Sequence, residues 1–319
     1  MTMTDQTDQP GEQVDHTPAP YATPEELRAA LVDAGVVFLT AVDGVYHRSW
    51  AWEKVLRGVE SHVIAQRVAL GAPQRWFPPI MPREEFLKTD YVRSFPDLVG
   101  SIDVFTGGDK EHRALLEVLE SGEDWTTHLT PAEVVLPSSV CHPLYGNLPH
   151  DVPAEGLDEE CSGWSFRHEP SLDPARMQIF RIYEFVKIGT PEQSLAHRDE
   201  WLDRGLAALS ELGLPVRSVA ANDPFFGRVG KMLAANQIHA SLKYEMVVDL
   251  TDVKPTAIGS SNYHEDHFGH GFELHLADGT PAHSACIGFG LDRITLALFA
   301  THGMDVEAWP EGVRSALQC

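Results

Sequence analysis

Positive charge is scarce in this sequence. Lys and Arg number 24 against 47 Asp and Glu in 319 residues, which gives a formal net charge of −23 at pH 7. Binding to nucleic acid depends on Lys and Arg that neutralise phosphates, and an acidic surface repels polyanions. We therefore expect no tRNA or other nucleic acid as the main partner.

Long apolar runs and cysteines are also few. No stretch approaches the roughly 18 apolar residues of a membrane helix, and the first residues contain no apolar signal region. The four cysteines, Cys141, Cys161, Cys286 and Cys319, have no disulfide-framework spacing. We expect a soluble cytoplasmic protein with no membrane partner, whose thiols are reduced or bind a metal.

The chain is nevertheless 43% apolar and long enough for one large core. Residues 1–20 are polar and predict a disordered tail. A short N-terminal element follows at 21–48, and a large domain at 49–319. Strand patterns there come in runs and do not alternate regularly with helices, which predicts an α+β fold with an antiparallel sheet flanked by helices.

Several elements carry clear local signals. Thr23 caps a helix that begins at Pro24, residues 51–70 form an amphipathic helix, and residues 190–213 form another with a Thr190–Gln193 capping box. The segment 176–189 is a long strand. Asp43-Gly44 and Asp278-Gly279 predict hairpin turns, and a helix begins at Leu291.

One residue is out of place in the 176–189 strand. Side chains alternate along a strand, so Glu184 shares one face with Phe180, Ile182, Val186 and Ile188. A carboxylate in such an apolar row must be paired, protonated or bound to a cation. The pattern leaves an Arg partner and a cation equally open.

Two further stretches combine residues suited to anions and metals. In "SACIGFGLDR", Cys286 precedes two glycines and Arg293 at a strand-to-helix junction, although a free cysteine is most often a small buried apolar residue. In "FRHE", Arg167 can hold a phosphate through its planar guanidinium, and Glu169 can orient an amine or a metal.

These motifs occur in an order that resembles the class II aminoacyl-tRNA synthetases. "FRHE" followed by "FRIYEF" resembles their second motif, and "GFGLDR" resembles the third. The 51–70 helix running into "RWFPPI" resembles the first, which forms the dimer interface in that class. "LTPAEVVL" and "LKYEMVV" resemble the Thr-x-Glu loop and the Lys-Tyr-Asp-Leu strand of seryl-tRNA synthetases. The resemblance implies a class II fold and a homodimer.

The resemblance also implies a metal. The atypical, methanogenic seryl-tRNA synthetases bind Zn²⁺ through Cys, Glu and Cys, and the matching positions here are Cys141, Glu184 and Cys286. Two thiolates and a carboxylate suit Zn²⁺, and three protein ligands leave a position open for the substrate amino group.

The chain has the synthetase core without the tRNA-binding arm, whose place the 21–48 element takes. This combination is similar to the amino acid:[carrier protein] ligases, truncated homologues of the atypical synthetases. The resemblance implies ATP-dependent, Mg²⁺-assisted activation of glycine or alanine and transfer to the phosphopantetheine thiol of an acidic carrier protein. It assigns ATP to Arg167, Glu169, Arg176, Met177, Phe185, Lys243 and Arg293, with Phe185 stacking on adenine, and the amino acid to Glu133, Glu184 and Asn262.

The segment 222–240 is extra relative to the synthetase core. It is free of acidic residues beyond Pro224 and carries Arg228 and Lys231 beside Phe225 and Phe226. An exposed helix of this kind can dock an acidic carrier protein, with the charges steering and the aromatic rings anchoring. The alternative is that the phenylalanines belong to the core.

Three other functions stay open. The chain can be an atypical seryl-tRNA synthetase-like enzyme with another acceptor, or a non-catalytic paralogue that acts as a binding module, although Arg167, Glu169 and Arg293 are retained. His264 and His267 also have a spacing that can bind the metal of a hydrolase, without the two-histidine helix motif of such enzymes.

Overall fold

The computed structural model describes residues 19–67, 71–222 and 241–319. In these ranges the main sheet has seven strands in the order β3-β7-β8-β12-β11-β10-β9. Every neighbouring pair is antiparallel except β3 with β7. The strands are β3 (Gln74–Phe77), β7 (Leu157–Phe166), β8 (Ile179–Gly189), β9 (Arg217–Ala220), β10 (Lys243–Val248), β11 (Thr256–Glu265) and β12 (His283–Gly290). The predicted antiparallel α+β class is confirmed.

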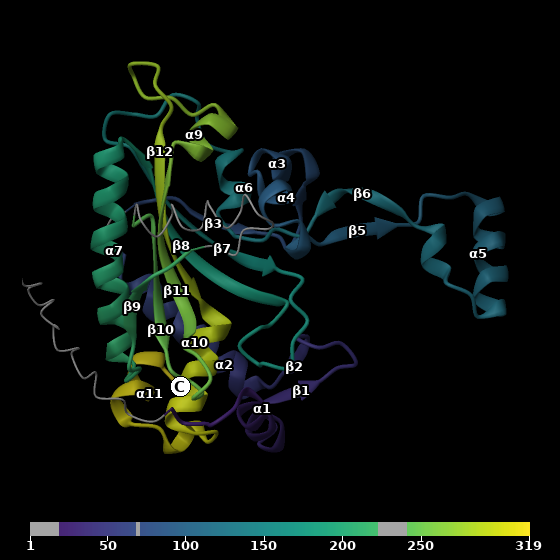
Figure 1. Cartoon of the computed structure of the whole chain (residues 1–319), viewed down its shortest axis with the longest axis horizontal. Helices are drawn as coiled ribbons and strands as arrows, with labels where there is room; N and C mark the ends of the chain where they lie inside the picture. Colours follow the sequence, from purple (N-terminus) through teal and green to yellow (C-terminus); the bar gives the residue numbers. More distant parts are fainter. Residues whose placement is uncertain (1–18, 68–70, 223–240) are drawn as a thin grey trace, which may run out of the picture.

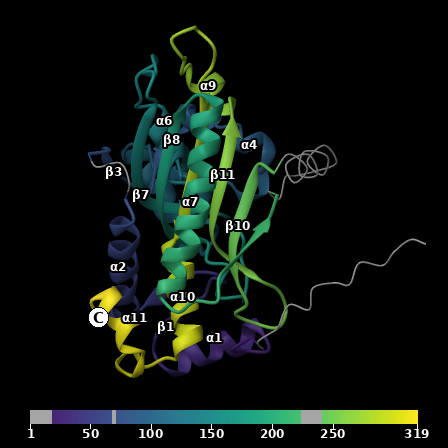
Figure 2. The ribbon, with the colours of Figure 1, turned by 90° about the vertical axis from the view of Figure 1, so that its left-hand side faces the viewer.

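Helices cover one face of this sheet. The long helix α7 (Pro191–Glu211) packs against β8, β11 and β12, as Figure 2 shows. Helix α2 (Trp50–Ala65) packs against α10 (Leu291–His302) and α11 (Glu311–Leu317). Trp52 of α2 stacks on Phe299 of α10 and donates from Nε1 to Asp292 Oδ1 at 3.2 Å. These contacts form the part of the hydrophobic core that lies between the sheet and these helices; the same core continues on the other face of β8 through Phe180, Ile182 and Val186.

The capping signals of the sequence are observed. Thr23 accepts a hydrogen bond from the Glu26 amide at the start of α1 (Pro24–Asp33), and the Thr190–Gln193 capping box opens α7. The first predicted hairpin forms β1 (Val37–Leu39) and β2 (Tyr46–Arg48). These N-terminal elements share the main core through Leu27 and Leu31.

The hairpin predicted around Asp278-Gly279 is mostly wrong. The turn exists, but the first arm begins inside the end of helix α9 (His267–Phe272) and pairs with the second arm only through an isolated bridge between His275 and Pro281. The reason is packing, because Phe268 and Phe272 lie one helical turn apart and both contact the ring of Tyr145.

A smaller sheet, in the order β4-β6-β5, projects from the body (Figure 1). It contains β4 (Met81–Pro82), β5 (Ser101–Val104) and β6 (Thr130–Val135), and helix α5 (Asp109–Ser121) lies at its far end. Short helices α3 (Arg83–Lys88), α4 (Tyr91–Ser94) and α6 (His142–Tyr145) complete this region.

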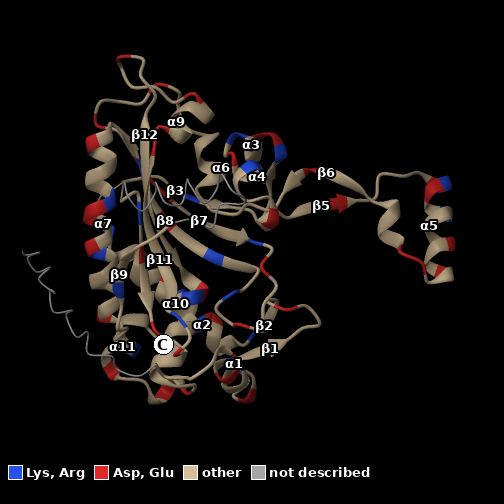
Figure 3. Ribbon diagram, in the orientation of Figure 1, with Lys and Arg blue, Asp and Glu red and all other residues tan. Residues whose placement is uncertain are grey.

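Acidic residues are frequent on the outer helices α5 and α7, as Figure 3 shows. No helix among the described residues is long and apolar enough to cross a membrane. The predicted docking residues Phe225, Phe226, Arg228 and Lys231 lie outside the described residues.

Candidate active site

Glu184 lies on the face of β8 that points away from the helices. The odd positions of the strand face the helices: Arg181 pairs with Glu53 of α2 at 2.6 Å, and Phe185 stacks on Trp201 of α7. Glu184 is directly opposite Gly288 of β12, which has no side chain beyond its hydrogen. The alternation of β8 thus places the carboxylate on the other face, and the glycine leaves one side of it open.

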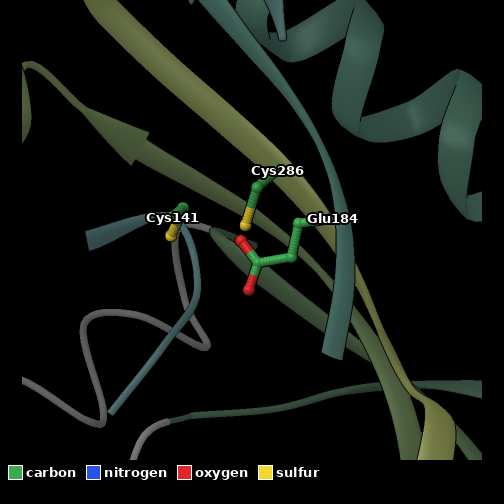
Figure 4. Close-up of side chains that lie close together, drawn as sticks. All are labelled: Cys141, Glu184 and Cys286. Carbon is green, nitrogen blue, oxygen red and sulfur yellow. The ribbon is translucent and has the colours of Figure 1, made fainter. Parts of the chain in front are cut away.

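Two cysteines meet Glu184 on that face. Cys286 comes from the neighbouring strand β12, and Cys141 from the turn before α6 (Figure 4). All three residues are buried, and their sulfur and carboxylate atoms lie within 4.8 Å of one another. It is the one group of three or more metal-ligating side chains among the described residues. Cys161, opposite Glu184 on β7, is not part of it.

Only one of the two carboxylate oxygens of Glu184 has a hydrogen-bond partner among the described residues. Ser139 Oγ donates to Oε1 at 2.8 Å, whereas Oε2 is buried without a hydrogen-bond partner among the described residues. Burial, together with the nearby Cys286, raises the pKa of Glu184 to about 8. An unpartnered buried carboxylate oxygen beside two sulfurs is an arrangement that a cation stabilises. The donor set therefore fits Zn²⁺.

The two thiols are not equivalent. The Cys141 thiol donates toward Cys286, which lowers the pKa of Cys286 well below its ordinary value and, together with burial, raises that of Cys141. Asn262 Nδ2 also donates to Cys286 Sγ at 3.5 Å. These hydrogen bonds favour the thiolate form of Cys286, and thiolates rather than thiols bind metals.

An arginine pair lies on the same face. The guanidinium groups of Arg167 and Arg293 lie over the ring of Phe180, with 5.6 and 5.8 Å between each carbon Cζ and the ring centroid. Arg293 donates to the backbone oxygens of Ala175 at 2.8 Å and Ala257 at 3.1 Å. Burial lowers the pKa of Arg293 to about 10, so this side chain stays charged at neutral pH.

The arginines are connected to the cysteine cluster. Arg167 Nε donates to the Ser138 carbonyl at 3.3 Å, three residues before Cys141. In the loop between β7 and β8, Arg176 Nη1 lies 2.7 Å from Glu169 Oε1. Two positively charged side chains with free donor capacity beside a buried thiolate cluster can bind a phosphate next to a metal-held group.

The remaining predicted residues fall into two groups. Asn262 contacts the cluster, and Lys243 lies directly opposite Asn262 in the β10–β11 register, with its Nζ 3.5 Å from Glu245 Oε1. Glu133 does not reach the cluster: its side chain is 88% exposed on β6 of the smaller sheet and pairs with Arg83 at 3.2 Å. Glu133 lies away from the cluster because β6 belongs to the smaller sheet.

Two other residues that the resemblance assigned to ATP, Phe185 and Met177, also lie away from the cysteine cluster. Phe185 is buried on the helix side of β8, with 3.9 Å between its ring centroid and that of Trp201. Met177 is buried under the N-terminal element, where Arg48 Nη2 donates to its sulfur at 3.5 Å. The aromatic side chain on the site face is Phe180, which strand alternation from Glu184 identifies in the sequence.

The histidines do not form a second metal centre among the described residues. His267 Nε2 lies 3.1 Å from the Thr89 carbonyl, and His264 Nε2 lies 3.5 Å from Cys286 Sγ. His264 and Ser139 both contact the cluster, and sequence reasoning assigned neither of them to it. Each lies within two residues of an assigned position in sequence, Asn262 and Cys141.

Solved structures of seryl-tRNA synthetases have the same fold. The Methanopyrus kandleri enzyme, crystallised with A. aeolicus tRNASec, superposes with a TM-score of 0.78 at 22% identity, covering 98% of this chain and 64% of that chain. The cytoplasmic serine-tRNA ligase of Naegleria fowleri with AMP gives a TM-score of 0.69 at 14% identity over 95% and 69%. The predicted class II synthetase-like fold is confirmed.

Sequence relatives give a narrower assignment. No protein-family model matches the chain. It is 26% identical to the type-2 serine–tRNA ligase of Methanopyrus kandleri, over 76% of this chain and 50% of that protein. It is 40% identical to amino acid–[acyl-carrier-protein] ligases 1 and 2 of Bradyrhizobium diazoefficiens, covering 86% and 95% of this chain and 85% and 90% of those proteins. The chain therefore belongs to the amino acid–[acyl-carrier-protein] ligase family.

Proposed function

We propose that this protein activates a small amino acid, glycine or alanine, with ATP and transfers it to the phosphopantetheine thiol of a carrier protein. The names of the 40% identical relatives support the activation and the acceptor. The observation that carries the proposal is the buried Cys141–Glu184–Cys286 cluster beside Arg167 and Arg293. A metal ion held by this small, buried cluster could bind an amino group, and the arginines could bind phosphates.

The first step joins the amino acid to AMP. A carboxylate oxygen of the amino acid attacks the α-phosphorus of ATP, the bond to the β-phosphate oxygen breaks, and pyrophosphate leaves with the electron pair. Arg167 and Arg293 hold the phosphates and stabilise the charge that develops on them. Phe180, whose ring lies beside both arginines, stacks on the adenine in place of Phe185. Glu169 with Arg176, and Lys243, position the nucleotide.

The second step moves the aminoacyl group. The carrier thiol, losing its proton, attacks the carbonyl carbon of the adenylate, AMP leaves, and a thioester forms. The covalent chemistry needs no protein nucleophile, so the residues of this site bind and orient the reactants.

Zn²⁺ would be held by Cys141, Glu184 and Cys286 and would supply a Lewis-acid position for the neutral amino group. Asn262, which already contacts Cys286, would line the same pocket. Mg²⁺ bound to ATP would be held by phosphate oxygens and a carboxylate. Glu245 is a candidate carboxylate, because it is directly opposite Ser260 on the site face.

Three partner and location assignments belong to the same proposal. The protein is a homodimer through α2 and β3, which the exposed Trp50 (67%) and Trp76 (60%) support. All four cysteines are free thiols, as expected of a cytoplasmic protein. The carrier protein docks on Phe225, Phe226, Arg228 and Lys231, an assignment that rests on the sequence alone.

ATP–pyrophosphate exchange measured across small amino acids tests the activation step. We expect exchange with glycine or alanine and not with serine; no exchange with any amino acid would refute the proposal. Radiolabelled amino acid then reports the acceptor. Label on a phosphopantetheinylated carrier protein supports the ligase function, whereas label on tRNA identifies the synthetase-like alternative that the 26% identity to type-2 serine–tRNA ligase keeps open.

A further inference from the structure

Strand β11 is irregular beside the cysteine cluster. Tyr263 is opposite Ala285 of β12, but Glu265 is already opposite Ser284, so His264 is the extra residue of a β-bulge. Glu265 has a left-handed backbone with φ of 54°, which is strained for a residue other than glycine. Bulges near active sites commonly redirect a side chain. Here the redirected residue is His264.

The ring of His264 is held on three sides. Nε2 lies 3.5 Å from Cys286 Sγ, and Nδ1 lies 3.0 Å from Ser284 Oγ. The ring also packs edge-on against Phe268, with centroids 5.0 Å apart and an interplanar angle of 78°. Such a ring has little rotational freedom, so the direction of Nε2 is fixed by the fold.

The hydrogen-bond partners of Nδ1 determine which ring nitrogen of His264 carries the hydrogen. Tyr145 and Ser284 are buried hydroxyls, and the Tyr145 hydroxyl lies 3.5 Å both from Ser284 Oγ and from His264 Nδ1. Tyr145 donates to Ser284 Oγ, so the Ser284 hydroxyl hydrogen can be directed at Nδ1. We assign the neutral tautomer in which Nδ1 accepts and the ring hydrogen is on Nε2, because Nε2 faces Cys286 Sγ and a thiolate sulfur only accepts hydrogen bonds.

We propose that His264 is a positioning residue for the metal: its Nε2–H, together with Asn262 Nδ2–H at the same distance of 3.5 Å, holds the Cys286 sulfur in place as a ligand. Two donors on one sulfur orient its remaining lone pairs and moderate its charge. Hydrogen bonds of this kind to metal ligands contribute about 10–100-fold to metal affinity. The inference rests on the proposed metal site and adds a residue to it that is not a ligand.

The test compares zinc affinity in variants that separate donation from packing. His264→Leu fills the space without a donor, whereas His264→Gln keeps a terminal N–H. His270→Leu is the control, because this histidine is on the adjacent helix α9 with a side chain 66% exposed. We expect His264→Leu to bind Zn²⁺ about 10–100-fold more weakly by chelator competition. His264→Gln and His270→Leu should stay within a few-fold of the wild type.

Cobalt gives a second readout that does not depend on catalysis. In Co²⁺-loaded protein, the sulfur-to-cobalt charge-transfer absorption should shift in His264→Leu and stay unchanged in His270→Leu. Ser284→Ala, which removes the donor to Nδ1, should show part of the same loss if His264→Leu does not fold. Zinc affinity in His264→Leu equal to the wild type, or a loss in His264→Gln as large as in His264→Leu, would overturn the role of His264.

The outcomes also distinguish this inference from the proposed function. A wild-type protein that catalyses pyrophosphate exchange but binds no Zn²⁺ overturns the metal assignment and the role of His264 together, while the activation step stands. A wild type that binds Zn²⁺ but shows no exchange refutes the proposed activity and leaves His264 to be judged by the affinities alone.

Discussion

The two phenylalanines of β8 provide a direct test of which face of the sheet binds ATP. Phe180 contacts Arg167 and Arg293 on the face of Glu184, and Phe185 lies on the opposite face against Trp201. Replacing each by Ala should therefore have different consequences, although both side chains are buried and five residues apart on one strand.

The expected sizes follow from what each ring contacts. Phe180→Ala removes a stacking partner for adenine, and base–aromatic stacking contributes about 1–3 kcal/mol, so the KM for ATP should rise about 5- to 150-fold. Phe185→Ala leaves a cavity in the core and breaks the stack on Trp201, which should cost about 3–5 kcal/mol of unfolding free energy. Its KM for ATP should stay near the wild-type value.

Pyrophosphate exchange at varied ATP gives the KM, and urea denaturation gives the unfolding free energy. Both variants should lose stability, because Phe180 is also part of the core. The KM comparison is therefore made at a temperature where each variant is fully folded by circular dichroism. A rise in the KM for ATP in Phe185→Ala and not in Phe180→Ala would refute the proposal that ATP binds on the Phe180 face of the sheet.

Two further predictions concern the metal and the phosphates. Cys286→Ser should lose both tightly bound zinc, measured by elemental analysis, and pyrophosphate exchange. Cys161 is a buried cysteine outside the cluster, so Cys161→Ser should keep both. Equal zinc content in the two variants would contradict the metal assignment. Arg293→Lys should lower kcat for exchange by about 10²–10³, because Lys cannot contact two backbone oxygens and a phosphate at once; unchanged kinetics would remove Arg293 from the site.

Strand periodicity and the motifs contributed different parts of the candidate site: the motifs gave the arginines and the cysteines, and periodicity gave the face of β8. Alternation along residues 176–189 correctly placed Glu184 on one face, and the same rule identifies Phe180 as its aromatic neighbour. The assignment of Phe185 followed the motif and not the two-residue period, and the structure has its ring on the face of β8 opposite to Glu184. Glu133 lies away from the cluster for a different reason, since local sequence gives no information that β6 pairs in a separate sheet.

The part that local spacing could not predict depends on register. The family resemblance grouped Cys141, Glu184 and Cys286, and they meet because β8 pairs with β12 and because Cys141 lies in the turn before α6. The bulge at His264 depends on one extra residue in β11, and the residue types there contain no signal for it. Contacts of this kind come from pairing between distant segments, which composition and local spacing do not encode.

Cys286 and Arg293 are connected by one strand end and one helix start, so the proposed metal and phosphate sites are held at a fixed separation. Gly288 lies between them on β12, directly opposite Glu184. A Cβ there would lie 3.5 Å from Glu184 Oε1 and 3.6 Å from Ile182 Cγ2, which are ordinary contact distances. The protein should therefore tolerate Gly288→Ala without rearranging.

Gly288→Ala should separate catalysis from stability. A strand alanine is about 0.5–1 kcal/mol more favourable than glycine, so the unfolding free energy should be equal or higher, and zinc should stay bound. In our proposed function the amino acid carboxylate meets the α-phosphate between the metal ligands and Arg293, that is, over Gly288; an added methyl group there should lower exchange at least tenfold, which corresponds to about 1.4 kcal/mol. Gly312→Ala, with no atom within 4 Å of its Cβ, controls for the substitution itself. Full exchange activity in Gly288→Ala would mean that the substrates do not meet over this glycine, and the two sites would then have to be connected by another route.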